Sequence, residues 1–260
     1  MLTGAERAGP QTRVPDSRSE EFRMPTCNVL VTGANRGIGL EFVRQLLARQ
    51  TGGKVIACCR HPGKATALNT LAGEHPGHLH VMPLDVADPK SHLALAHELP
   101  LVLGDHGQLD LLVNNAGVLH SGERFGTVSA GNLEDSLRTN AVGPFLLTQT
   151  LAPLLAEGAR VANLSSALGS ISGVARFGTP SYRISKAAQN MANILLAKAL
   201  AERSIFVVTL HPGWVQTAMG GEQAPVTVPD SVAGMLQVID GLQEEDSGSF
   251  RDYLGQPIEW

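Results

Sequence analysis

Tyr182 and Lys186 are the two side chains whose types and spacing most directly suggest chemistry. They lie four residues apart in a segment, 181–202, that the sequence predicts to be helical, so both would project from one helix face. A free tyrosine has a pKa of about 10, and a neighbouring ammonium group favours the tyrosinate and lowers that pKa. Such a pair could transfer a proton near neutral pH, although most Y-x-x-x-K patterns are surface pairs.

A glycine-rich turn supplies a second candidate site. Residues 32–39 read TGANRGIG and join a short β-branched run to an amphipathic helical stretch. Gly33 could form the tight turn, Gly37 would let the backbone approach a pyrophosphate, and Gly39 would let the helix pack close to the strand. The helix N-terminus would offer free N–H groups and a positive dipole to the phosphates. The alternative is a strand-to-helix turn that binds no ligand.

The sequence alternates strand-like and helix-like segments, and these would form the framework that positions the candidate residues. The predicted strands are 28–31, 55–58, 80–82, 109–113, 160–164, 205–210 and 248–254. The predicted helices are 38–47, 63–72, 89–103, 132–156, 181–202 and 230–241. Continuous apolar strands separated by helices of about ten or more residues are typical of a parallel sheet with both faces covered. We therefore predict an α/β fold: a single-domain, doubly wound Rossmann fold with a mostly parallel seven-stranded sheet and its ligand site beyond the carboxyl ends of the strands.

The first residues differ from the rest of the chain. Basic and acidic residues balance there, apolar residues are few, and no helical period is present. We predict a disordered extension over residues 1–24 and one domain over residues 25–260. The extension contains no continuous apolar stretch of the kind that a secretory signal needs. A transit role for this extension is the alternative.

The composition narrows the class of protein. Of the 260 residues, 43% are hydrophobic and 17% are charged, which is typical of a globular domain. A net charge of −4 argues against a nucleic-acid-binding surface. The longest apolar runs are far shorter than the roughly 18–20 residues of a membrane-spanning helix. Three cysteines without a CxxC pair suggest neither a disulfide scaffold nor structural zinc. We expect a cytoplasmic protein with no metal, no membrane span and no nucleic-acid partner.

Short polar motifs recur at the carboxyl ends of the predicted strands. They are DV at 85–86, NNAG at 114–117, NLSS at 163–166 and HPG at 211–213. Together with the glycine turn and the tyrosine–lysine pair, they make the sequence from about Cys27 to Trp260 similar to the short-chain dehydrogenase/reductase family. Within that family it most resembles the sniffer-like (C-factor-like) carbonyl reductases. The segments that carry this closer likeness are residues 59–60, 211–215, 219–221 and 258–260.

The resemblance implies four catalytic residues. They are Asn140, Ser166, Tyr182 and Lys186. Tyr182 would give a proton to a carbonyl oxygen, and Ser166, chosen over Ser165 by family position, would hydrogen-bond that oxygen. Asn140 would extend a proton relay from Lys186 through a water. Pro144 adds a local reason, because it lacks the N–H that would otherwise bond the Asn140 carbonyl in a helix. The alternative is a kinked helix with an ordinary polar residue.

The predicted cofactor is NADP(H). Folds that prefer NAD place an acidic residue after the second strand, and Arg60 holds that place here. Arg36 is a second cation, and two guanidinium groups favour a 2′-phosphate. By resemblance, Asp85 would face the adenine, Asn115 its ribose and Thr217 the nicotinamide amide. The predicted cofactor-binding residues are Gly33, Asn35, Arg36, Gly37, Ile38, Gly39, Arg60, Asp85, Val86, Asn115, Ala116, Gly117, Tyr182, Lys186, Pro212, Gly213, Val215 and Thr217.

The function implied by the resemblance is NADPH-dependent reduction of a small or medium carbonyl compound, an aldehyde, ketone or quinone, by hydride transfer. The alternative is a non-catalytic NADP-binding protein that signals through a partner. The intact set of four catalytic residues favours the enzyme, because a pure binder needs no proton relay. The loop 170–179 could shape the pocket, with Phe177 as a contact, or could simply face solvent. We also expect a homodimer formed through the Ala- and Leu-rich segments 132–156 and 181–202.

Overall fold

A computed structural model describes residues 27–49, 52–104 and 107–260. The disordered extension predicted for residues 1–24 lies outside these described residues. Within them, no helix is both long and apolar enough to cross a membrane.

Seven strands form one sheet in the order β3-β2-β1-β4-β5-β6-β7, and all neighbouring strands are parallel. The strands are β1 Val29–Thr32, β2 Val55–Cys59, β3 Leu79–Pro83, β4 Leu109–Asn114, β5 Leu155–Leu164, β6 Phe206–His211 and β7 Phe250–Asp252. The order runs outward in both directions from β1 and β4, which defines a doubly wound sheet. The predicted fold class is therefore confirmed.

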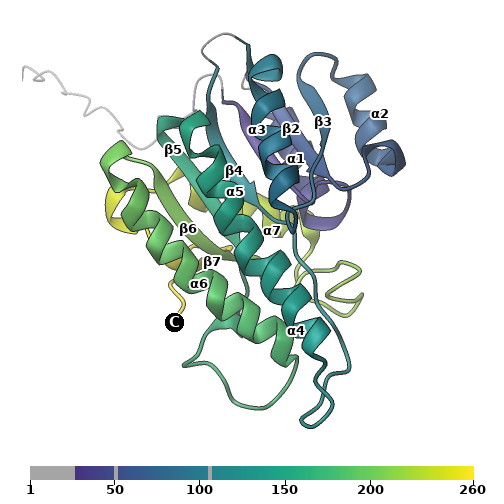
Figure 1. Cartoon of the computed structure of the whole chain (residues 1–260), viewed down its shortest axis with the longest axis vertical. Coiled ribbons are helices and arrows are strands. Elements are labelled where there is room, and N and C mark those ends of the chain that lie inside the picture. Colours follow the sequence, from purple (N-terminus) through teal and green to yellow (C-terminus); the bar gives the residue numbers. More distant parts are fainter. Residues whose placement is uncertain (1–26, 50–51, 105–106) are drawn as a thin grey trace, which may run out of the picture.

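Helices cover both faces of this sheet (Figure 1). They are α1 Gly37–Ala48, α2 Thr66–Glu74, α3 Pro89–Leu103, α4 Ala130–Leu137, α5 Gly143–Leu151, α6 Pro180–Leu200 and α7 Val228–Asp240. Alternate strand residues point to opposite faces. Val31 accordingly packs in the core cluster that includes α1, α2 and α7. Leu30 packs in the cluster that includes α3, α5 and α6.

The long helix predicted over 132–156 is wrong in two respects. A π-helical turn, Arg138–Val142, separates α4 from α5, and the Gly143 N–H donates to the Arg138 carbonyl, five residues back. Pro144 has no N–H for the usual helical bond, which favours this wider turn. The helix then ends at Leu151, just before Pro153, and β5 begins at Leu155 instead of near residue 160.

The junction between the π-turn and α5 leads to a stability prediction. A Cβ atom at Gly143 would lie 2.3 Å from the carbonyl oxygen of Val86, in the segment after β3. Gly143→Ala should therefore lower the free energy of unfolding by about 1–3 kcal/mol, as overpacking usually does. Urea unfolding followed by circular dichroism measures this loss.

Gly131→Ala is the matched control, because a Cβ at Gly131 in α4 would meet only the Ser129 hydroxyl, at 3.6 Å. Alanine is favoured over glycine in helices by about 1 kcal/mol at most. Gly131→Ala should thus leave stability unchanged or raise it slightly. An equal response from the two variants would contradict the packing argument.

Candidate functional site

The carboxyl ends of the parallel strands meet at one edge of the sheet, and the predicted site residues follow those ends. The topological switch lies between β1 and β4, the place where ligands of doubly wound sheets bind. The residues that follow β1 to β6 in turn are the glycine turn 33–39, Arg60, Asp85, Asn115, Ser166 and Pro212. The topology therefore gathers the predicted residues at one end of the molecule.

The glycine turn is tightly packed against the end of β4. Gly33 has a φ of +63°, a conformation that favours glycine. A Cβ at Gly39 would lie 2.4 Å from the Gly33 carbonyl oxygen and 2.5 Å from Asn115 Nδ2. That Nδ2 atom donates to the Thr32 carbonyl at 2.8 Å, so the side chain of Asn115 helps to hold the turn. Replacement of Gly39 by any larger residue would disrupt this contact.

The N-terminus of α1 offers unpaired backbone donors. Its N-cap, Arg36, makes no side-chain cap hydrogen bond, and the first turn contains no acidic residue. Free N–H groups and the helix dipole at such an end suit a phosphate. Thr217, from the segment after β6, approaches the same place, since its Cγ2 lies 3.6 Å from the position of a Cβ on Gly37. These residues therefore form a cradle that fits a dinucleotide.

The remaining predicted cofactor residues lie around this cradle with different exposures. Asn35, Arg36 and Arg60 are exposed, so their side chains are accessible to a ligand. Asp85 is half-buried, and its Oδ1 accepts from the Ala87 N–H at 3.0 Å. The positions predicted for the ligand's backbone and apolar contacts are mostly buried or half-buried, and they are Ile38, Val86, Ala116, Pro212, Gly213 and Val215, whereas Gly117 is exposed.

Ser166, Tyr182 and Lys186 come together beneath the loops of this edge. A hydrogen bond joins the side chains of Ser166 and Tyr182. The Lys186 Nζ lies 5.6 Å from the centre of the Tyr182 ring. Tyr182 is 8% exposed and Lys186 is 4% exposed, so the pair predicted from the sequence is a buried pair and not a surface one.

Burial controls the ionisation of this pair. Desolvation raises the pKa of Tyr182 to about 12, against the opposing effect of the Ser166 hydrogen bond. Desolvation also lowers the pKa of Lys186 to about 7. The sequence predicted a lowered tyrosine pKa, but burial disfavours both charged forms and outweighs that effect. Tyr182 is therefore a protonated phenol at neutral pH, which is the form that can donate a proton.

The two adjacent serines point to different surroundings. Ser165 Oγ donates to Asn190 Oδ1 at 2.7 Å, within the buried interface between β5 and α6. Ser166 Oγ contacts Tyr182 and accepts from the Leu168 N–H at 3.2 Å. The choice of Ser166 over Ser165 rested on family position, and this geometry supports it.

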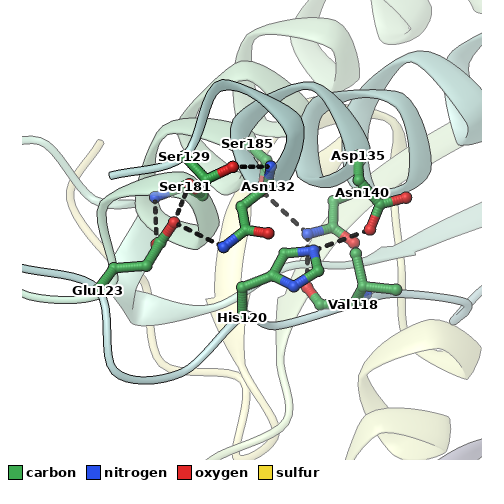
Figure 2. A network of polar contacts seen from close by, with 9 residues as sticks. All are labelled: Val118, His120, Glu123, Ser129, Asn132, Asp135, Asn140, Ser181 and Ser185. Atoms are coloured by element: carbon green, nitrogen blue, oxygen red, sulfur yellow. Dashed lines mark hydrogen bonds and ion pairs between the residues drawn. The ribbon is translucent and has the colours of Figure 1, made fainter. Parts of the chain in front are cut away.

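Asn140 lies in the π-turn and uses its side chain to fix two neighbouring segments. Its Nδ2 donates to the Val118 carbonyl and to Ser185 Oγ, both at 2.9 Å, and its Oδ1 accepts from the Val118 N–H at 2.8 Å (Figure 2). The position of a Cβ on Gly117 would be 3.2 Å from Asn140 Oδ1 and 3.9 Å from Lys186 Nζ. Asn140 therefore lies near Lys186, and the water relay through its carbonyl stays a prediction.

Glu123 is a structural residue of this site that sequence reasoning missed. Its carboxylate accepts from the Ser181 N–H at 3.1 Å and from Ser181 Oγ at 2.6 Å (Figure 2). Thr179, the N-cap of α6, makes no side-chain cap hydrogen bond, so Glu123 caps this helix from a distant loop. No local motif could reveal a partnership across 58 residues. It ties the loop after β4 to the helix turn that carries Tyr182.

Two exposed aromatic rings meet above this network. Phe177, which the sequence suggested as a pocket contact, packs edge-to-face on Phe125 with ring centres 5.8 Å apart. Phe125 belongs to the loop after β4 and Phe177 to the loop before α6. Both rings are more than half exposed. The pocket contact and the solvent-facing loop therefore both stay predictions for this segment.

The chain is similar in sequence and in structure to several known proteins. The model of the short chain dehydrogenase family matches residues 27–226. The chain is 44% identical over 156 residues to the C-signal of Myxococcus xanthus, a match that covers 59% of this chain and 94% of that protein. The NADPH-bound carbonyl reductase from chicken fatty liver is 40% identical, with a TM-score of 0.86 and coverage of 91% of this chain and 100% of that one. The carbonyl reductase Sniffer of D. melanogaster is 35% identical, with a TM-score of 0.86 and coverage of 90% and 100%.

The Glu123 cap leads to a pH-dependent prediction. The Ser181 hydrogen bond is the largest cause that lowers the pKa of Glu123 below its ordinary value of 4.5. A lowered folded-state pKa contributes stability above pH 4.5, and that contribution disappears as the pH falls through the folded-state value. Glu123→Ala should therefore reduce the free energy of unfolding by about 1 kcal/mol at pH 7, as loss of a helix cap does. The deficit should shrink towards pH 3 in urea titrations.

Glu134→Ala provides the comparison, because Glu134 is an exposed carboxylate on the neighbouring α4. An exposed substitution of this kind changes stability by about 0.5 kcal/mol or less. A deficit for Glu123→Ala that stayed constant between pH 7 and pH 3 would show that the carboxylate charge is not what stabilises α6.

Proposed function

We propose that this chain, which belongs to the short-chain dehydrogenase family, reduces small or medium carbonyl compounds to alcohols with NADPH. The family resemblance predicted from the motifs is confirmed, and the chain is an oxidoreductase of that family. The observation that carries the proposal is a protonated, buried Tyr182 phenol hydrogen-bonded to Ser166 at the sheet edge that also holds the glycine turn. Aldehydes, ketones and quinones are the proposed substrates.

NADPH is the proposed cofactor because the residues around the glycine turn fit it. The N-terminus of α1 has no side-chain cap, and the tight turn made by Gly33 and Gly39 would bring a pyrophosphate to its N–H groups. Arg36 and Arg60 are exposed cations, and a guanidinium group suits a 2′-phosphate. The chicken relative is an NADPH-bound carbonyl reductase, which supports the same choice. We assign the adenine, its ribose and the nicotinamide amide to Asp85, Asn115 and Thr217 respectively.

The proposed chemistry is a hydride transfer coupled to a proton transfer. NADPH, when bound, supplies the hydride that reaches the carbonyl carbon. Ser166 Oγ would donate a hydrogen bond to the carbonyl oxygen and so stabilise the negative charge that develops there. Tyr182 Oη would give its proton to that oxygen, which completes the alcohol and leaves a tyrosinate.

Lys186 would return a proton to the Tyr182 tyrosinate. Its pKa of about 7 lets the ammonium give up a proton, and regain one from water, near neutral pH. While charged, it also stabilises the tyrosinate, whose ring centre lies 5.6 Å from the Lys186 nitrogen. Asn140, beside Lys186, is the proposed route to that water. Proton balance is restored at the end of each turnover.

A second candidate function is a non-catalytic, NADP-binding signalling role. The similarity to the C-signal of Myxococcus xanthus is the observation that favours it. A signalling protein would need the cofactor site but not the phenol of Tyr182. Substitution of that phenol therefore separates the two candidates.

We also propose a homodimer located in the cytoplasm. Apolar side chains at positions 184, 191 and 195 of α6 are about half exposed, as is Val142 in the π-turn, and a second copy of the chain could cover them. The three cysteines are free and buried, which suits a reducing compartment. Burial raises the pKa of Cys27 to about 12, so this thiol is unreactive.

Tyr182→Phe tests the proposed function. NADPH oxidation should first be measured with a panel of aldehydes, quinones, diketones and steroids. Loss of the phenol proton should then lower kcat by about 10²–10⁴-fold, the usual contribution of a general acid. NADPH binding, followed by fluorescence, should change little, because Phe preserves the ring.

Tyr253→Phe is the matched control, since the chain has only two tyrosines. It should retain activity within about twofold, because Phe keeps the ring that packs beside Gly213 and removes only a hydroxyl. Full activity of Tyr182→Phe would refute the enzymatic mechanism. The signalling role would be favoured if the native protein reduced no carbonyl and if Tyr182→Phe had the same effect in cells as the native protein.

Arg60→Asp tests the cofactor preference. The new carboxylate should repel a 2′-phosphate and accept hydrogen bonds from ribose hydroxyls. The ratio of kcat/KM for NADPH to that for NADH should fall by about 10-fold or more, the worth of one charge-assisted hydrogen bond. Arg44→Asp, an exposed change further along α1, should leave the ratio unaltered. A native kcat/KM for NADH equal to that for NADPH would already contradict the preference.

A further inference from the structure

Gln189 occupies a position that the mechanism above does not use. It follows Tyr182 by seven residues and Lys186 by three, so all three side chains share one face of α6. Gln189 is only 3% exposed. Its Oε1 atom accepts a hydrogen bond from Lys186 Nζ at 2.8 Å. A buried amide in direct contact with the relay lysine calls for a functional explanation.

The hydrogen bonds of Lys186 show what Gln189 does to the ammonium group. A lysine ammonium has three N–H donors. One donates to the Leu164 carbonyl at the end of β5, at 2.7 Å, and one to Gln189 Oε1. Among the described residues, these two acceptors fix the nitrogen and leave a third donor free. Gly117 and Asn140 line the side of Lys186 nearest the loop after β4.

Gln189 is also a neutral partner in a region without compensating charge. Burial is the one cause that lowers the pKa of Lys186 to about 7, so no carboxylate among the described residues supports its charge. Tyr182 is the titratable group in contact with it. The titratable residues on the elements packed against α6 are Glu134 and Asp135 on α4, Arg138 in the π-turn, Glu202 and Arg203 in the 3₁₀ turn Ala201–Arg203, and His211 on β6. An amide oxygen favours the ammonium form without pairing it with a negative charge.

We propose that Gln189 is a positioning residue that anchors the Lys186 ammonium through its side-chain oxygen and so holds the nitrogen beside the Tyr182 ring. The kinetic part of this inference rests on the proposed function, whereas the effect on Lys186 itself does not. With the acceptor in place, the nitrogen stays within reach of the phenol. Without it, the lysine would lose both its orientation and part of its charge.

The test measures the ionisation of Lys186 directly. The chain has five lysines, at positions 54, 64, 90, 186 and 198, so a ¹³C-lysine NMR titration yields few signals, and Lys186→Arg assigns the relevant one. Gln189→Met removes the acceptor at nearly constant volume and should lower the pKa of Lys186 by about 1–2 units, the worth of a hydrogen bond to a charged group. Gln189→Glu places a carboxylate at the same point and should raise that pKa by at least about 1 unit.

Steady-state kinetics provide the second readout. The high-pH limb of the kcat/KM profile, where Lys186 loses its proton, should move to lower pH in Gln189→Met and to higher pH in Gln189→Glu. At pH 8, kcat/KM should therefore fall about 10-fold in the first variant, since one pKa unit corresponds to a tenfold change in ionisation. A purely structural role would lower activity in both variants without opposite shifts of the profile.

Asn193→Leu is the matched control on the same helix. Asn193 is fully buried one turn beyond Gln189, and its Oδ1 accepts from Asn163 at 2.7 Å, with no hydrogen bond to Lys186. This variant should lower the melting temperature while the pKa of Lys186 stays unchanged. It therefore separates loss of a buried amide from loss of the lysine anchor.

The outcomes separate the two proposals. An unmoved Lys186 pKa in either folded Gln189 variant would overturn the positioning role, whatever the enzyme activity. A native protein that reduces no carbonyl would overturn the proposed function, while the NMR result would still decide the role of Gln189. If Gln189→Met fails to fold, the Gln189→Glu titration alone decides, and a raised Lys186 pKa supports the proposal.

Discussion

Burial of an ammonium group beside a phenol is the constraint on which the site depends. An unpaired charge in a protein interior is unfavourable by several kcal/mol unless it is hydrogen-bonded or gives up its proton. This chain uses both responses at Lys186, which has two hydrogen-bond acceptors and a pKa lowered to about 7. The acceptors come from the end of β5 and from α6, so the position of the lysine depends on how the helix packs on the sheet. A local motif alone could not fix it.

The same interface contains a line of buried amides. Asn114 Nδ2 donates to Thr148 Oγ1 and to Asn163 Oδ1, and Asn163 Nδ2 donates to Asn193 Oδ1. These contacts join α5, β4, β5 and α6 through the core next to the site. Buried polar groups that satisfy one another specify a single arrangement more strictly than apolar packing does. The line therefore fixes the register of the elements that carry Tyr182 and Lys186.

The sequence predicted the framework because that information is local. The periods of the strands and helices gave the parallel sheet, and the spacing of Tyr182 and Lys186 placed them on one helix face. The end of α5 was missed because the Ala- and Leu-rich residues after it also favour a helix by composition. In the folded chain they instead begin β5, which pairs with β4. Glu123 was missed because its partner is remote in the chain. The direction of the Tyr182 pKa shift was also wrong, since burial is a property of the folded chain and not of a four-residue pattern.

The loop after β4 is held at two points, by Asn140 at Val118 and by Ser181 at Glu123. The stretch 124–128 that follows Glu123 is exposed and carries Phe125, next to Phe177 of the opposing loop. The two anchored residues and the exposed aromatic pair therefore lie on different parts of the same segment. Side chains at 125 and 177 can therefore change without disturbing the two anchors, so the outer surface of this loop is free to vary while Tyr182 and Lys186 keep their places.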